Sequence, residues 1–221
     1  ITHEINQPLQ AVGNYANALS RLLNGQIEQG SDAQECLAGM TAGVQRAGEI
    51  IVGLQHFVSK GDGRVRALSV NEIVEETLTL VGFAVRAKQA SLRLELCETN
   101  PQVEAEKVQL QQVLVNLIVN GCEAMDELPV AERKLTICVV SRPDCVEVVV
   151  QDQGPGVDDE TAARMFDPFF TTKNDGMGMG LAISATIVES LGGRVRHETP
   201  STGGAAFCCA LPILRNGSHH E

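Results

Sequence analysis

Two asparagine side chains in the middle of the sequence could bind a metal ion. Asn116 and Asn120 stand four positions apart in segment 107–128, which is predicted to be a helix, so both amides project from one helix face. An amide oxygen is a suitable ligand for Mg²⁺, which keeps several waters and takes further ligands from phosphates. Glu123 lies near the same face, where it is either a holder of metal-bound water or a solvated surface charge. This helix is therefore a candidate metal site.

An aspartate at the end of a predicted strand could bind a nucleotide base. Asp152 follows the β-branched run 146–150 and begins the motif Asp-Gln-Gly-Pro-Gly, which contains Gly154 and Gly156. A carboxylate at this place can accept a hydrogen bond from the amino group of adenine, while the glycines let the base approach the backbone. The same residues also suit an ordinary turn, so the motif alone leaves both interpretations open.

A glycine-rich segment further along could bind phosphates. Gly176, Gly178 and Gly180 alternate with methionines, and a predicted helix begins before Leu181. Such a segment offers backbone N–H groups and a helix N-terminus to anions. Lys173 adds a positive charge three residues upstream. The spacing is not the dinucleotide-binding fingerprint and no Gly-Lys-Ser follows, which excludes Rossmann and P-loop sites.

The first residues place a histidine on a helix that is predicted to dimerise. Apolar residues recur in steps of four and three over 5–23 and again over 33–58, which is the seam of a coiled coil. Two such helices form an antiparallel hairpin, and pairing with a second copy as a four-helix bundle would bury both seams. A hairpin packed on the rest of the same chain is the alternative. His3 lies roughly 200° around the helix from Ile5 and faces away from the seam, and Pro8 loosens the turn beside it.

The remaining segments predict a second domain that positions the other motifs. Residues 61–66 form a predicted linker between a hairpin domain, 1–60, and a domain over 67–214, while 215–221 are predicted to be a tail outside the fold. Periodicity predicts helices over 70–85, 107–128 and 180–191, and strands over 91–97, 135–141, 145–151, 193–198 and 204–211. This order predicts an α+β sandwich, a mostly antiparallel sheet covered on one side by helices.

Composition limits the partners and the compartment. The chain has 17 Lys and Arg against 28 Asp and Glu, a net charge of −11, which argues against nucleic acid because phosphate backbones require clustered cations. No run reaches the roughly 18 apolar residues of a membrane helix, so this segment is expected to make no membrane contact, although a longer parent chain could be membrane-anchored. The 7 cysteines contain no C-x-x-C pair. Most lie in apolar runs, which predicts buried thiols in a reducing, cytoplasmic compartment.

Six motifs, in this order, resemble one family. His3-Glu4-Ile5-Asn6-Gln7-Pro8-Leu9 resembles the H-box of sensor histidine kinases of two-component systems, in the HE-x-NQPL subgroup that includes nitrogen-fixation and dicarboxylate sensors. Further matches are to the N-box, the G1 box, the F-box, the G2 box and a closing strand motif, at 116–125, 152–156, 166–170, 176–181 and 203–212. The resemblance covers residues 1–212. It implies a histidine-bearing dimerisation hairpin followed by a Bergerat-type ATP-binding α/β sandwich.

The resemblance also implies roles for single residues. His3 would be autophosphorylated from ATP, with Glu4 bonded to its second ring nitrogen, and the phosphoryl group would pass to an aspartate of a response regulator. Gln7 stands where other subgroups carry the Thr or Asn tied to phosphatase activity. Asn120 would bind Mg²⁺. The implied nucleotide site comprises residues of the N, G1 and G2 boxes and the preceding loop: Asn116, Asn120, Glu123, Asp152, Gly154, Gly156, Lys173, Gly176, Gly178, Gly180 and Leu181.

Two other functions stay open at this point. A nucleotide-sensing dimer or pseudokinase is favoured by two departures from the family pattern, Gly121 for the usual Ala and Ala205 for the usual Thr. An ATPase or serine kinase of the same fold would leave the H-box unexplained. Related ATPases carry a Glu at the position of Asn116 to activate water. The neutral amide instead implies protection of ATP from hydrolysis until a histidine arrives.

Overall fold

The computed structural model describes residues 64–173 and 178–214. The predictions for the hairpin 1–60, including its four-helix bundle, lie outside these residues, as do Gly176 and the tail 215–221. In chain order the elements are β1 (Arg66–Ser69), α3 (Val70–Ala87), β2 (Ser91–Glu95), β3 (Gln102–Ala105), α4 (Lys107–Ala124), the 3-10 turn η1 (Val130–Glu132), β4 (Lys134–Ser141), β5 (Cys145–Gln151), α5 (Asp159–Arg164), α6 (Gly180–Ser190), β6 (Arg194–Glu198) and β7 (Ala206–Pro212).

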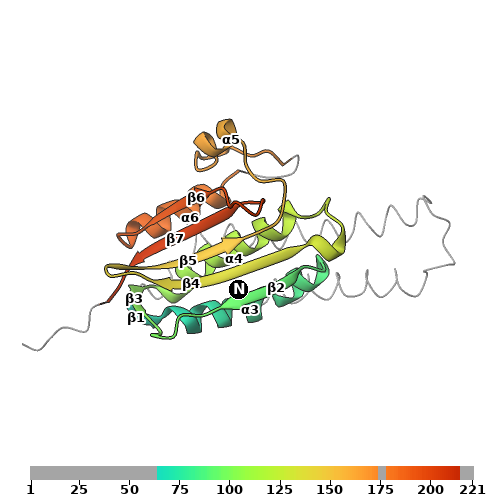
Figure 1. Ribbon diagram of the computed structural model, residues 1–221. Coiled ribbons are helices and arrows are strands. Elements are labelled where there is room, and N and C mark those ends of the chain that lie inside the picture. Colours follow the sequence, from blue (N-terminus) through green and yellow to red (C-terminus); the bar gives the residue numbers. More distant parts are fainter. Residues whose placement is uncertain (1–63, 174–177, 215–221) are drawn as a thin grey trace, which may run out of the picture. The chain divides into compact units, whose positions relative to one another are not determined.

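Five strands form one mixed sheet in the order β2-β4-β5-β7-β6 (Figure 1). β2 runs parallel to β4, with Leu92 opposite Leu135, and the other neighbours are antiparallel. Along β4, Leu135, Ile137 and Val139 are buried while the residues between them are more exposed. Because burial alternates with a period of two residues, one face of the sheet lies toward the core. The predicted, mostly antiparallel sheet is confirmed.

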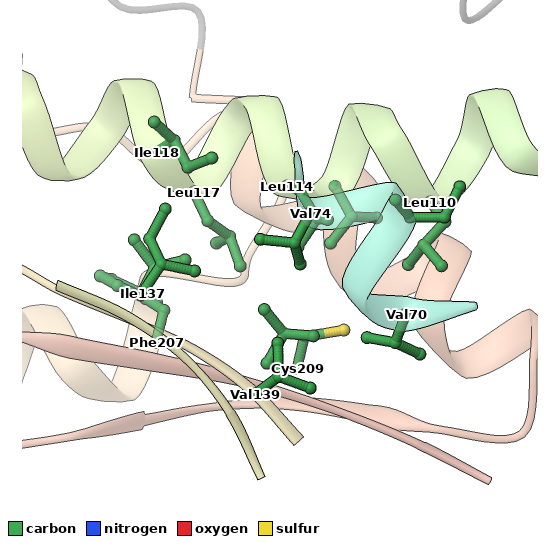
Figure 2. Packing of buried hydrophobic residues seen from close by; sticks show 14 of the residues in the cluster. Val70, Val74, Leu110, Leu114, Leu117, Ile118, Ile137, Val139, Phe207 and Cys209 are labelled. Atoms are coloured by element: carbon green, nitrogen blue, oxygen red, sulfur yellow. The ribbon is translucent and has the colours of Figure 1, made fainter. Parts of the chain in front are cut away.

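Three helices, α3, α4 and α6, lie on one face of the sheet (Figure 1). Figure 2 shows Leu110, Leu114 and Leu117 of α4 directed toward the strands, where Ile137 and Phe207 lie. The three leucines are at most 1% exposed. Their spacing of four and three places them on one helix face, and burying each contributes about 2 kcal/mol. The predicted sandwich, with helices on one side of the sheet, is confirmed.

α4 ends earlier than the sequence predicts. The helix stops at Ala124 instead of Leu128, and the next residue, Met125, is fully buried. The Arg133 guanidinium donates to the carbonyl oxygens of Asp126 and Leu128 at 2.8 and 3.0 Å. The carbonyl groups just after the helix are therefore satisfied by a side chain and not by a further helical turn.

Arg133 should be important for the stability of this domain. It also donates to the carbonyl oxygen of Lys88 at 2.9 Å, so one guanidinium ties the ends of α3 and α4 to the start of β4. We expect Arg133→Met, which keeps much of the aliphatic stem, to lower the free energy of unfolding by about 2 kcal/mol. Urea unfolding measures this. The matched control is Arg93→Met, because Arg93 is 76% exposed and pairs with Glu95. Equal losses in the two variants would contradict the role of Arg133.

Three short elements have no signal in the sequence analysis. β1 pairs antiparallel with β3 as a separate two-stranded sheet, and strands of four residues are too short for a clear period. β1 begins at Arg66, the last residue of the predicted linker. α5 has 6 residues and is capped by Asp158, whose carboxylate accepts the Thr161 N–H at 2.7 Å. Figure 1 shows α5 standing away from the sheet and its helices.

The cysteines of the described ranges are all free thiols. Cys122, Cys208 and Cys209 are buried, and the other three are half-buried: Cys97, Cys138 and Cys145. The predicted burial of thiols is therefore confirmed for half of them. In residues 64–173 and 178–214 no helix has the length and apolar character that crossing a bilayer requires.

Candidate nucleotide-binding site

Asp152 is a buried carboxylate just after the end of β5. Its side chain is 2% exposed. Asp152 Oδ1 accepts the backbone N–H of Gly154 at 2.8 Å and that of Ala205 at 3.3 Å. These two bonds fix the carboxylate through one oxygen, which orients Oδ2 as an acceptor for an external donor such as an adenine amino group.

Burial dominates the electrostatics of this aspartate. It raises the pKa of the Asp152 carboxyl, against the lowering effect of the Gly154 and Ala205 N–H groups and of His197. Burial also lowers the pKa of His197, against the field of Asp152. The His197 ring lies 5.6 Å from the Phe207 ring, centroid to centroid. Its Nε2 is buried without a hydrogen-bond partner among the described residues.

Glycines near Asp152 bring backbone segments close together. A Cβ on Gly154 would stand 2.7 Å from the Ala124 carbonyl oxygen, and one on Gly121 would stand 2.8 Å from a Leu135 methyl and 3.6 Å from Asp152 Cβ. The end of α4 and the segment after β5 are therefore in close contact. Gly156 has a φ of +80°. Gly121 lies close to Asp152, and the residue before it in α4 is the candidate metal ligand Asn120.

The two asparagines lie on one face of α4, as predicted, and they contact α6. Asn116 Nδ2 donates to Ser184 Oγ at 2.9 Å, and Asn120 Nδ2 donates to Asn116 Oδ1 at 3.4 Å. A Cβ on Gly180 would stand 2.3 Å from Asn116 Oδ1, so only glycine lets the start of α6 approach this amide. Asn116 is thus engaged between the helices, whereas the oxygen of Asn120 remains available to a cation.

A positive side chain already contacts that oxygen. Lys173 Nζ donates to Asn120 Oδ1 at 3.1 Å and forms an ion pair with Glu123. An ammonium group is a stand-in cation here, and an amide oxygen beside a carboxylate is a donor set that suits Mg²⁺. Glu123 is half-buried and pairs with Lys173, and both roles predicted for it stay open. The part of the chain that the structure describes has no group of three or more His, Cys, Asp and Glu side chains that could hold a metal ion.

The glycine-rich segment is described from Gly178 onward. α6 begins at Gly180, and the preceding Met179 makes no side-chain cap, so the first N–H groups of the helix are not taken by that residue. Gly178 has a φ of +65°, and a Cβ there would stand 2.5 Å from the Phe169 carbonyl carbon. Leu181 packs against the hydrophobic core. The predicted phosphate-binding role of these residues and of Gly176 stays a prediction.

The phenylalanine-rich segment before this loop is only partly buried. Phe166 and Phe170 pack against the core, and the Arg164 guanidinium lies 4.7 Å from the Phe170 ring centroid. Phe169 is 74% exposed and has a φ of +67°. Two of the three aromatic rings therefore anchor the segment, and the third is presented to solvent.

Two hollows in the described surface lie away from Asp152 and Asn120. One of about 260 Å³ is lined by residues such as Glu147 and Pro212, and one of about 330 Å³ by residues such as Ser69 and Lys107. Neither contains Asp152 or Asn120. The candidate site rests on side-chain chemistry, not on the size of a hollow.

The structure brings the predicted residues of α4, β5 and the loop before α6 together, and it adds two partners. Ser184 and the backbone N–H of Ala205 were not found from the sequence. Ser184 could have been noticed because it stands four residues after Gly180, on the same face of α6. A backbone donor such as that of Ala205 has no sequence signal. His3, Glu4 and Gln7 lie outside the described residues.

Similarity to known proteins agrees with this geometry. The sequence profile of the histidine kinase-, DNA gyrase B- and HSP90-like ATPases matches residues 105–215. The C4-dicarboxylate transport sensor protein DctS of Rhodobacter capsulatus is 36% identical over 218 residues, which are 99% of this chain and 33% of that protein. The chain therefore spans about a third of the length of that relative.

Solved structures give the same fold. The catalytic domain of histidine kinase ThkA is 31% identical with a TM-score of 0.61, covering 67% of this chain and 95% of that one. Histidine kinase ThkA in complex with response regulator protein TrrA has a TM-score of 0.65 at 23% identity, covering 96% of this chain and 61% of that one. The second likeness shows the fold alone. The domain after residue 63 is thus a Bergerat-type α/β sandwich. The chain belongs to the histidine kinase-, DNA gyrase B- and HSP90-like ATPase family, and it carries the ATP-binding catalytic domain of a two-component sensor histidine kinase.

Proposed function

We propose that the chain autophosphorylates His3 from Mg·ATP and passes the phosphoryl group to an aspartate of a response regulator. One observation carries the nucleotide half of the proposal. Asp152 is buried and held through Oδ1 by two backbone N–H groups, and Gly121, the residue after Asn120, lies close to it. A carboxylate suited to a base and an amide suited to a cation therefore belong to one part of the domain. ThkA, a histidine kinase of the same fold, has been solved in complex with a response regulator, which is the class of acceptor proposed for this chain.

The proposed chemistry is an in-line phosphoryl transfer. A ring nitrogen of His3 forms a bond to the γ-phosphorus of ATP while the bond from phosphorus to the bridging oxygen breaks, and its electron pair leaves with ADP. Glu4 holds the second ring nitrogen and stabilises the positive charge that develops on the imidazole. Mg²⁺, when bound by Asn120, supplies charge neutralisation to the phosphates, and Lys173 supplies a second cation.

The environment of Asn116 supports a kinase over an ATPase. Hydrolysis needs a base that takes a proton from water. Asn116 is a neutral amide whose nitrogen donates to Ser184 and whose oxygen accepts from Asn120. An amide has no basic site for this task at neutral pH. ATP bound beside it would therefore persist until a histidine arrives.

We further propose the organisation of the whole chain. The chain would consist of a hairpin domain, a linker and an ATP-binding domain, over residues 1–60, 61–66 and 67–214. It would form a homodimer through the hairpin and lie in the cytoplasm. Gln7 is proposed to orient water if the protein also removes the phosphoryl group from its partner.

Nitrogen-bound phosphate is acid-labile and base-stable, which distinguishes it from the serine phosphate of the alternative kinase.

We expect His3→Gln to lose all incorporation of γ-phosphate from labelled Mg·ATP, because glutamine has no nucleophilic ring nitrogen. The label on the wild-type chain should be acid-labile and base-stable. The matched control is His56→Gln, the other histidine of the hairpin domain, which should keep wild-type labelling. Labelling of His3→Gln would refute the assignment of the acceptor. Nucleotide binding by the wild-type chain without any labelling would support the sensor or pseudokinase instead.

A further inference from the structure

A hydrogen-bonded chain of side chains links α6 to the proposed metal ligand on α4. Asn116 donates to Ser184 at 2.9 Å, Asn120 donates to Asn116 at 3.4 Å, and Lys173 donates to Asn120 at 3.1 Å. Ser184 is 2% exposed, whereas Lys173 is exposed. This series of hydrogen bonds therefore runs from the interior of the domain to the proposed cation site.

The direction of each amide decides which atom reaches the cation. An asparagine side chain has a donor nitrogen at one end and an acceptor oxygen at the other. Because Asn116 gives its nitrogen to Ser184, its oxygen accepts the nitrogen of Asn120, and Asn120 must then present its oxygen outward. If Asn116 turned over, the order would reverse. Asn120 would then present an N–H group, which repels a cation.

α6 contacts the Asn116 side chain at two points, Gly180 and Ser184. A Cβ on Gly180 would stand 2.3 Å from Asn116 Oδ1 and 3.2 Å from Nδ2, so the oxygen occupies the gap that the missing Cβ leaves. Ser184, four residues later on the same face, receives the nitrogen. Ser184 is 2% exposed, and its hydroxyl accepts the Asn116 nitrogen at 2.9 Å. This bond holds the half-buried Asn116 side chain against α6 in the observed direction.

We infer that Ser184 is a positioning residue for cation binding: its hydroxyl fixes the Asn116 amide, and that amide turns the Asn120 oxygen toward the metal. The inference rests on the proposed function, because it takes Asn120 as the Mg²⁺ ligand. Ser184 itself touches neither nucleotide nor metal in this arrangement. Losing a partner that orients a metal ligand typically lowers metal affinity by about 10- to 100-fold.

The test uses the full chain with Mn²⁺ as a paramagnetic probe and a non-hydrolysable ATP analogue. Ser184→Ala removes the hydroxyl with little change in volume. The matched control is Ser190→Ala on the same helix, where the hydroxyl donates to the Ile187 carbonyl oxygen at 2.7 Å. We expect Mn²⁺ affinity, measured by electron paramagnetic resonance, to fall about tenfold in Ser184→Ala and to stay unchanged in Ser190→Ala. Affinity for the analogue in EDTA should be unchanged in both.

Four outcomes decide whether Ser184 positions the metal ligand. Wild-type Mn²⁺ affinity in Ser184→Ala would overturn the inference. An equal loss of analogue affinity in EDTA would also overturn it, because the residue would then be needed for packing alone. Asn120→Ala is measured alongside: if it too keeps wild-type Mn²⁺ affinity, the metal assignment of the proposed function fails, and the role of Ser184 fails with it. Loss in Asn120→Ala without loss in Ser184→Ala rejects only the role of Ser184.

Discussion

Asp152→Asn should weaken the binding of ADP about a hundredfold, a loss of roughly 3 kcal/mol, while the domain stays folded. Asparagine keeps an oxygen to accept the N–H groups of Gly154 and Ala205, so the local backbone is preserved. Its other end becomes an N–H₂ donor, which would face the amino group of adenine, itself a donor. Isothermal titration calorimetry measures the loss. The site would also be left with a buried group that has no partner.

The matched control for this change is Asp158→Asn. Asp158 caps α5 by accepting the Thr161 N–H at 2.7 Å, and asparagine caps a helix about as well as aspartate. The control should therefore bind ADP like the wild type. Unchanged ADP affinity in Asp152→Asn would show that adenine is not bound by this carboxylate. Urea unfolding of both variants separates a binding effect from a folding effect.

The same carboxylate predicts a pH dependence of binding. Burial raises the pKa of Asp152 in the free protein, and an adenine amino group donates to the ionised form, so nucleotide binding lowers that pKa. Affinity is then complete above the raised pKa and falls as the pH drops through it. The decline should begin at a higher pH than for an ordinary aspartate. Because phosphates titrate too, the ratio of wild-type to Asp152→Asn affinity is the quantity to follow, and it should shrink on acidification.

Gly204→Ala should destabilise the domain by about 4 kcal/mol, the largest effect on folding that we expect. Gly204 has a φ of +78°, and a Cβ there would stand 2.0 Å from the Asp152 carbonyl oxygen and 2.7 Å from its carbon. Backbone atoms cannot move aside cheaply. The Asp152 N–H donates to the Ala205 carbonyl oxygen at 3.0 Å, so the displacement would also disturb the nucleotide site.

The neighbouring glycine separates the clash from the backbone strain. Gly203 has a φ of +87°, but a Cβ there would meet nothing within 4 Å. Gly203→Ala should therefore cost only the strain of a left-handed residue, about 1 kcal/mol. Urea unfolding of the two variants gives the difference directly. Similar losses at both positions would mean that the close approach of Gly204 to Asp152 is not important for stability.

Periodic segments of this domain could be predicted from sequence because their burial follows a local rule. The apolar spacing of α4 and the alternation of β4 both follow from one element facing one core. The early end of α4 could not be predicted in this way. It depends on Arg133, which lies further along the chain and binds the carbonyl groups of Asp126 and Leu128, just after the end of the helix. Contacts of this kind have no period along the chain.

The candidate site shows the same division. Asp152, Asn116 and Asn120 could be identified because each residue type suits its chemistry and follows a recognisable element. Their partners come from distant segments. Lys173 reaches Asn120 across 53 positions, and Ala205 N–H reaches Asp152 across 53 positions. The ion pair of Glu123 with Lys173 spans 50 positions and likewise has no signal in the sequence.

The position of β7 has a consequence for biosynthesis. This strand, the last in the described part of the chain, lies between β5 and β6 in the sheet. The polypeptide just before β7 also supplies Ala205, whose N–H holds Asp152. While the ribosome still covers residues 205–212, the nascent domain therefore has a gap inside its sheet, and the Asp152 carboxylate lacks one of its two N–H donors. The nucleotide site proposed above would thus be complete only after β7 has joined the sheet.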